Sequence, residues 1–80
     1  MLTKRQREVL TIMRDKAGSE AGEIVYEKGE GYLGNRRISS KTIFSLIRLT
    51  ALRACGDQNG GLERYRIGQT GIELLKKGPR

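Results

Sequence analysis

The sequence predicts a small α+β domain that occupies the whole chain, residues 1–80. Two stretches, 4–16 and 41–51, repeat apolar residues at the three- and four-residue spacing of an amphipathic helix. Between 52 and 67 the pattern changes to strand-like alternation around an Asn-Gly dipeptide, which favours a β-hairpin. Helices on both sides of a two-stranded hairpin indicate the α+β class.

The first helix is predicted over 4–16. Thr3 and Gln6 have the spacing of a capping box, in which each side chain bonds the backbone amide of the other residue. Gly18 is well placed to end the helix. An apolar stripe follows the helical repeat through Val9, Leu10, Met13 and Ala17, with Ile12 beside it. We expect this helix to serve as core scaffold.

The stretch from 18 to 38 contains five glycines and has two interpretations. Ser19 can cap a short helix that runs to Lys28. Alternatively, the β-prone run Ile24-Val25-Tyr26 is a strand that enters a hairpin through 28–31. We favour the helix, because the family resemblance described below has a helix at this place.

A second amphipathic helix is predicted over 41–51, with Ser39 or Ser40 as its N-cap. A helical wheel places six residues on one apolar arc: Leu46, Thr50, Ile43, Ile47, Ala51 and Phe44. The opposite face carries Lys41, Thr42, Ser45 and Arg48. No carboxylate occurs between Gly31 and Asp57, so nothing on this face repels an anion.

The hairpin is predicted from strands at 52–55 and 62–67, joined by a turn at Asn59-Gly60. In the second strand Tyr65 and Ile67 alternate with Arg64 and Arg66, giving one apolar face and one guanidinium face. A final helix follows over 69–77, with Ile72 and Leu75 toward the core and Gly78-Pro79 after its end. We expect Phe44 and Tyr65 to be core residues rather than base-stacking platforms.

The net charge of +7 is unevenly distributed. Residues 1–30 carry equal numbers of basic and acidic side chains, whereas residues 31–80 carry ten basic and three acidic ones. This asymmetry indicates a polyanionic partner for the second half of the chain. A membrane surface is not expected, because no stretch combines a basic face with an exposed apolar one.

Enzyme chemistry is not expected. The chain has no histidine and a single cysteine, which excludes an intrachain disulfide, a tetrahedral zinc site and a histidine-activated nucleophile. Cys55 is expected to be a small buried residue. Residues 29–34 match G-x-G-x-x-G but lack the strand-and-helix context of a dinucleotide site, and the acidic series Glu20, Glu23, Glu27 and Glu30 is expected to be solvated. We therefore expect no cofactor and no metal.

The chain also lacks a long apolar run or a signal-like N-terminus, so we expect a soluble, cytoplasmic, nucleoid-associated protein.

Two stretches carry a resemblance to a known family. Residues 38–52, where Ile-Ser-Ser precedes a helix that begins Lys-Thr-Ile, resemble the recognition helix of bacterial winged-helix regulators. Residues 65–75 are similar to the end of the wing in PadR-like and MarR-like regulators, with Gly68 in place of the family's threonine. In the family a second helix precedes the recognition helix, whereas here a glycine-rich segment intervenes.

The resemblance implies a winged helix-turn-helix domain that inserts the helix from Lys41 to Arg48 into the major groove of double-stranded DNA. The hairpin from Arg53 to Arg66 would then lie on the adjacent backbone or minor groove. The candidate DNA-binding residues are Arg36, Arg37, Ser40, Lys41, Thr42, Ser45, Arg48, Arg53, Arg64 and Arg66. The function expected is a small transcriptional regulator of bacterial or phage type.

Two alternatives remain open. One is a protein-interaction module within a larger assembly, and the other is a DNA-bending, excisionase-like factor. A homodimer through the terminal helices would extend the DNA site, because one recognition helix reads few base pairs. No separate effector domain fits in 80 residues, so ligand sensing would need a dimer interface or a protein partner.

Overall fold

Helix α1 (Lys4–Asp15) begins with the predicted capping box in the computed structural model, which describes residues 2–55 and 62–77. The Thr3 hydroxyl accepts from the amide of Gln6 at 3.1 Å, and the Gln6 side-chain oxygen accepts from the amide of Thr3 at 2.9 Å. The helix ends one residue before the predicted end, and Gly18 follows with a φ of +92°. Its buried residues are Val9, Leu10 and Met13, so the predicted scaffold helix is confirmed.

In the segment after α1 the favoured interpretation is wrong. Instead of a helix over 19–28, the chain makes a single 3₁₀ turn, η1 (Glu20–Gly22), and then enters strand β1 (Ile24–Glu27). Lys28 and Gly29 connect β1 to strand β2 (Glu30–Leu33), with φ values of +53° and +82°. Two successive positive φ angles are typical of a type I′ turn, whose twist matches that of paired strands. The hairpin alternative is therefore correct, and the β-branched and aromatic run of β1 prevails over the weak helical pattern.

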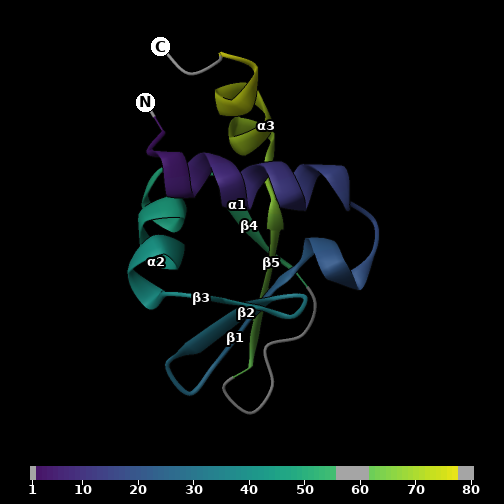
Figure 1. Cartoon of the computed structure of the whole chain (residues 1–80), viewed down its shortest axis with the longest axis vertical. Coiled ribbons are helices and arrows are strands. Elements are labelled where there is room, and N and C mark those ends of the chain that lie inside the picture. Colours follow the sequence, from purple (N-terminus) through teal and green to yellow (C-terminus); the bar gives the residue numbers. More distant parts are fainter. Residues whose placement is uncertain (1, 56–61, 78–80) are drawn as a thin grey trace.

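Within the described residues, five strands form one antiparallel sheet in the order β3-β2-β1-β5-β4 (Figure 1). Strand β3 (Arg36–Ile38) pairs with β2, while β4 (Leu52–Cys55) and β5 (Glu63–Ile67) form the predicted hairpin. The α+β class is confirmed, but the sheet is larger than the two-stranded wing expected, because β1 forms within the segment expected to be helical and β2 and β3 follow it. The predicted turn at 59–60 lies outside the described residues.

Helix α2 (Ser40–Arg48) has Ser39 as its N-cap, and the Ser39 hydroxyl accepts from the amide of Thr42 at 3.2 Å. The predicted end at 51 is three residues too late. Thr50 has a φ of +56°, and the amides of Thr50 and Ala51 donate to carbonyls of the last turn at 2.9 and 3.0 Å. These two bonds form a Schellman motif, which ends the helix although Thr50 is not a glycine.

Helix α3 (Gln69–Lys76) follows β5 directly, with Gly68 as an N-cap that offers no side chain. Leu75 is buried as predicted. Ile72 is only partly buried, and Leu74 packs against the core in its place. The predicted Gly-Pro stop at 78–79 lies outside the described residues.

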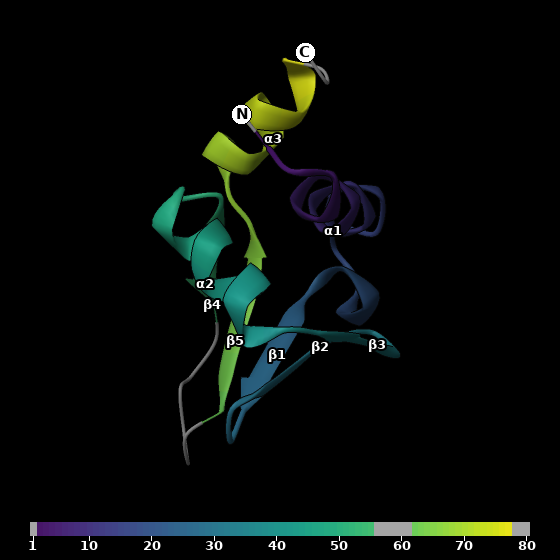
Figure 2. The ribbon, with the colours of Figure 1, turned by 60° about the vertical axis from the view of Figure 1, so that its left-hand side comes forward.

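The core lies between the helices and one face of the sheet. Ile24 pairs with Leu33 on one side and with Tyr65 on the other, and these three side chains point to the same face. Helix α1 crosses over β5, and α2 lies beside β4 (Figures 1 and 2). The helices contribute Val9, Leu10, Met13, Ile43, Leu46 and Leu75 to this core. The alternate residues of the strands therefore point away from it.

Candidate nucleic-acid interface

The exposed side of α2 carries two cations and one aromatic ring. Lys41, Phe44 and Arg48 stand three and four residues apart, which places them on one side of the helix, and all three are exposed. Ile43 and Leu46, on the other side, are fully buried. We call Lys41, Phe44 and Arg48 the α2 stripe.

Phe44 corrects the predicted core. Its position on the apolar arc predicts burial, yet 49% of the residue is exposed. The ring touches Tyr26 edge-on, with a centroid distance of 5.5 Å and an interplanar angle of 64°. The apolar arc is wider than the surface that covers α2, so the residue at its margin faces solvent. Tyr65, in contrast, packs against the core as expected.

Three hydroxyl residues predicted to face DNA are engaged in contacts that orient α2. Ser45 accepts from the side-chain amide of Gln6 at 2.9 Å and donates to the carbonyl of Thr42 at 2.7 Å. Ser40 donates to the carbonyl of Gly29 at 2.9 Å, and the Thr42 hydroxyl accepts from the N-cap hydroxyl at 2.9 Å. All three are half-buried, so the cations of the α2 stripe are more accessible than the hydroxyls beside them.

The face of the sheet opposite the core bears most of the predicted arginines. In one row across all five strands, Arg37, Tyr32, Val25, Arg64 and Cys55 lie directly opposite one another in turn. We call this the outer sheet face. Cys55, expected to be buried, is half-buried on this face. The alternation of β5 therefore gives the guanidinium face that the sequence predicts.

A second row of the outer sheet face places like charges together. Arg53 pairs directly with Arg66, an arrangement that destabilises a sheet. The Glu23 carboxylate compensates the charge of Arg66, because it accepts from the Arg66 guanidinium at 2.8 and 2.9 Å. This hydrogen bond, with the charge of Glu23, raises the pKa of Arg66 above its ordinary value. Within residues 2–55 and 62–77, no carboxylate lies within 4.0 Å of Arg53 or Arg64.

The adjacent arginines of β3 point in opposite directions, as neighbours in a strand must. Arg37 joins the outer sheet face, and its guanidinium lies 3.8 Å from the Glu30 carboxylate. Arg36 pairs opposite Leu33, so it points to the core side of this edge strand, where it is exposed.

Six of the ten predicted residues thus divide between two surfaces, while Arg36 lies on the core side of β3 and the three hydroxyl residues bond within or beside α2. Helix α2 packs on the core side of the sheet, and the α2 stripe faces away from it, whereas Arg37, Arg53, Arg64 and Arg66 lie on the outer sheet face. Sequence reasoning missed two aromatic residues at these surfaces, Phe44 and Tyr32, which are 49% and 40% exposed. The strand alternation around Tyr32 would have found it had the hairpin been favoured.

Other sites considered from the sequence are not assembled in the described part of the chain. Residues 29–34 span a turn, β2 and the start of the next turn, with no helix after the strand. No group of three acidic or cysteine side chains gathers as a metal site in the described ranges. Across 2–55 and 62–77, none of the helices has the length and apolarity needed to cross a membrane.

Comparison with known proteins identifies no relative of this chain. No family model, no curated protein and no solved structure matches the chain. Any functional conclusion therefore depends on the two surfaces themselves.

Proposed function

We propose that this protein is a small regulator that binds double-stranded DNA, with α2 in the major groove and the β4–β5 hairpin on the neighbouring backbone. The observation that carries the proposal is the α2 stripe, in which Lys41 and Arg48 are exposed on a helix face without a carboxylate. The major groove of B-DNA is about 12 Å wide and admits one helix.

The chemistry of the α2 stripe suits base edges as well as phosphates. Arg48 has the planar fork that bonds both acceptors of a guanine, and the Phe44 ring can contact the methyl group of a thymine. Lys41, in the first turn of α2, is placed for a phosphate beside the groove. The bonds of Ser45 to Gln6 and of Ser40 to Gly29 hold the helix in orientation.

The outer sheet face supplies cations of a different kind. Arg53 and Arg64 lie on the β4–β5 hairpin and have no carboxylate partner in the described chain. Because Arg53 also lies directly opposite Arg66, a polyanion would relieve the repulsion among these cations. These residues point away from α2. We therefore assign them to phosphates beyond the groove that α2 enters, which set position without reading sequence.

The order of elements supports a winged-helix interpretation. A capped helix is followed by an antiparallel hairpin and a short terminal helix, as in the regulators that residues 38–52 and 65–75 resemble. The hairpins of β1, β2 and β3 stand where that family has its second helix. In this proposal the three strands replace that helix as the support beneath α2, through the contact between α2 and β2.

The test is fluorescence anisotropy of a random-sequence duplex, titrated across a salt series from about 50 to 200 mM. We expect a steep loss of affinity with salt, equivalent to several displaced counterions. Lys41→Ala should reduce that slope by about one, because it removes one phosphate contact. Arg14→Ala removes the same charge from α1, where Arg14 already pairs with Asp15 at 3.2 Å, and should leave the slope nearly unchanged.

Specificity is tested on a duplex selected from a random pool. Arg48→Ala should relax the preference at one base pair and cost about 1–3 kcal/mol there, whereas Arg64→Ala should weaken all sequences alike. Equal effects of both substitutions on selected and random DNA would refute the placement of α2. A flat salt dependence would refute DNA binding itself.

A further inference from the structure

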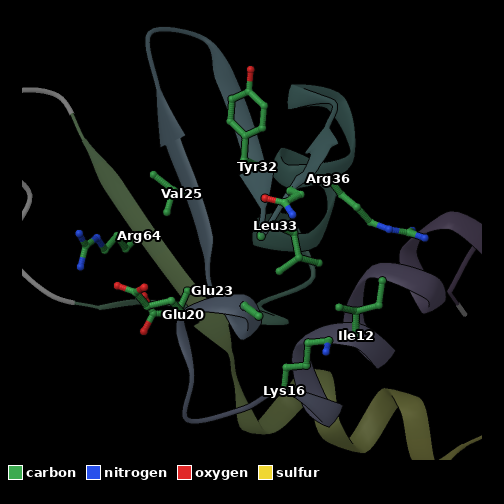
Figure 3. Close-up of a pocket in the computed structure, with 12 residues that line it drawn as sticks. Ile12, Lys16, Glu20, Glu23, Val25, Tyr32, Leu33, Arg36 and Arg64 are labelled. Atoms are coloured by element: carbon green, nitrogen blue, oxygen red, sulfur yellow. The ribbon is translucent and has the colours of Figure 1, made fainter.

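A cavity of about 890 Å³ opens where the C-terminal half of α1 meets β1, β2 and β3 (Figure 3). This volume falls within the range of about 300–1,000 Å³ that is typical of small-molecule sites. The cavity lies inside a single chain, so ligand binding needs neither a dimer interface nor a separate effector domain.

The inner wall of the cavity is apolar. Leu33 is almost fully buried and Ile12 packs against the core, so both are held in place by their neighbours. Ala21 adds a methyl group from η1, whereas Val25 lines the cavity from the outer sheet face and is not part of this wall. These walls favour a hydrocarbon body over a hydrated ion.

Cations stand on one side of this wall. In Figure 3 the side chains of Lys16 and Arg36 extend beside Ile12, from the end of α1 and from β3. Both are exposed, and neither lies within 4.0 Å of a carboxylate of the described residues. They are therefore available to an anionic group of a ligand.

The opposite side carries Glu20, Glu23 and Arg64. The Glu23 carboxylate is bound by Arg66 at 2.8 Å, and this ion pair compensates its charge. Glu20 is exposed at the rim. The cavity thus combines an apolar wall and a two-cation side with an opposite side that holds Arg64 and the Glu20 carboxylate, which forms no ion pair within residues 2–55 and 62–77.

We propose that this cavity binds a small organic anion with an apolar or aromatic body and one acidic group. The body lies against Ile12, Ala21 and Leu33, and the acidic group lies between Lys16 and Arg36. Glu20 repels the anion and sets the direction in which it enters. The site is separate from the α2 stripe, and the proposal does not depend on DNA binding.

The probe for this site is 1-anilinonaphthalene-8-sulfonate, an aromatic monoanion that fluoresces in apolar surroundings. Its uncharged analogue, N-phenyl-1-naphthylamine, has the same rings without the sulfonate. We expect saturable binding of the sulfonate at one site per chain. The Lys16→Gln/Arg36→Gln double variant should weaken the sulfonate about fivefold to tenfold and change the neutral analogue less than twofold, because exposed ion pairs each contribute modestly.

Two further variants locate the site. Ala21→Leu should fill the cavity beside Ile12 and Leu33 and weaken both probes at least tenfold; Ala21 is half-buried in η1. Glu20→Gln should strengthen the sulfonate about twofold by removing a repulsive charge. Lys41→Gln removes a cation from α2, outside the cavity, and should leave both probes unchanged. Unfolding midpoints in urea show whether each variant is folded.

Four outcomes would overturn the proposal. The first is no saturable fluorescence with the folded parent protein. The second is an equal loss of affinity for both probes in the double variant, which would show that the two cations do not bind the sulfonate. The third is unchanged affinity in folded Ala21→Leu, which would place the probe elsewhere. The fourth is weaker binding in Glu20→Gln, which would indicate a cavity for a cation or zwitterion.

Discussion

Gly71 lies in α3 at a position with no room for a side chain. The substitution Gly71→Ala therefore tests how closely α3 packs against Ala51 and β5. A Cβ at this position would lie 2.6 Å from the carbonyl oxygen of Ala51 and 2.9 Å from Cγ1 of Ile67. Ordinary contacts begin near 3.4 Å, so the first overlap is about 0.8 Å. The Ala51 carbonyl cannot retreat freely, because it also accepts from the amide of Gly68 at 2.8 Å.

The magnitude follows from two opposing effects. Overpacking of this kind costs about 1–3 kcal/mol, whereas replacing a glycine within a helix by alanine stabilises the helix by about 0.5–1 kcal/mol. Because the overlap is with a backbone carbonyl, the overpacking cost is in the upper part of its range, about 2–3 kcal/mol, and the net loss for Gly71→Ala is about 1–2.5 kcal/mol. In a domain of this size each kcal/mol lowers Tm by about 4–8 °C.

Urea unfolding followed by far-UV circular dichroism measures this loss, with Gly68→Ser as the matched control. A Cβ at Gly68 would lie 3.5 Å from the same carbonyl, and serine at this N-cap can accept from an amide of the first turn. We expect Gly68→Ser to be neutral or more stable by a few tenths of a kcal/mol. A Gly71→Ala protein at least as stable as the parent would refute the close seating of α3 against Ala51.

Two further predictions concern single hydrogen-bonded groups. Burial, followed by the hydrogen bond to Glu63, raises the pKa of Tyr65 to about 12. The stability that this hydroxyl contributes is therefore complete below about pH 10, the pKa of tyrosine in the unfolded chain, and is lost as the pH rises toward 12. Tyr65→Phe should remove this part of the alkaline loss of stability, measured by urea unfolding. An unchanged dependence of stability on pH would contradict the prediction. Gln6→Ala should cost about 1–2 kcal/mol, because it removes both the return bond to Thr3 and the bond to Ser45; a double-mutant cycle with Ser45→Ala measures the second bond, and a coupling of zero would show that it contributes nothing.

Local signals were sufficient for the helices and for the second hairpin. The capping box of α1 involves only Thr3 and Gln6, and the strands of 52–67 follow from alternation, so no distant contact is needed to predict either. The 19–28 segment is different, because Ser19 and Ile24 suit both a helix and a strand. The pairing of β1 with β5 determines that this segment forms a strand, and the partner residues in β5 lie some forty positions away in the sequence.

The same limit applies to the candidate interface. Sequence alternation correctly separated Arg64 and Arg66 from Tyr65, because a strand has only two faces. A helix has a continuous surface, and the wheel of α2 could not show which part of it α1 and the sheet cover. For that reason the wheel predicts a buried Phe44 and an exposed Ser45, whereas Phe44 is exposed and Ser45 is half-buried and bonds to Gln6.

The narrow exposed face of α2 limits what one copy of this protein can read. Among the three residues of the α2 stripe, only Arg48 has the geometry for a bidentate bond to a base, which discriminates by about 1–3 kcal/mol. Regulators that find their sites in a genome prefer them over random DNA by about 4–10 kcal/mol. One α2 therefore falls short, and two copies on a symmetric site would supply about 2–6 kcal/mol from their Arg48 side chains. A specific role in our proposal thus requires a second copy on the DNA, whereas a monomer would remain a weakly selective DNA-binding protein.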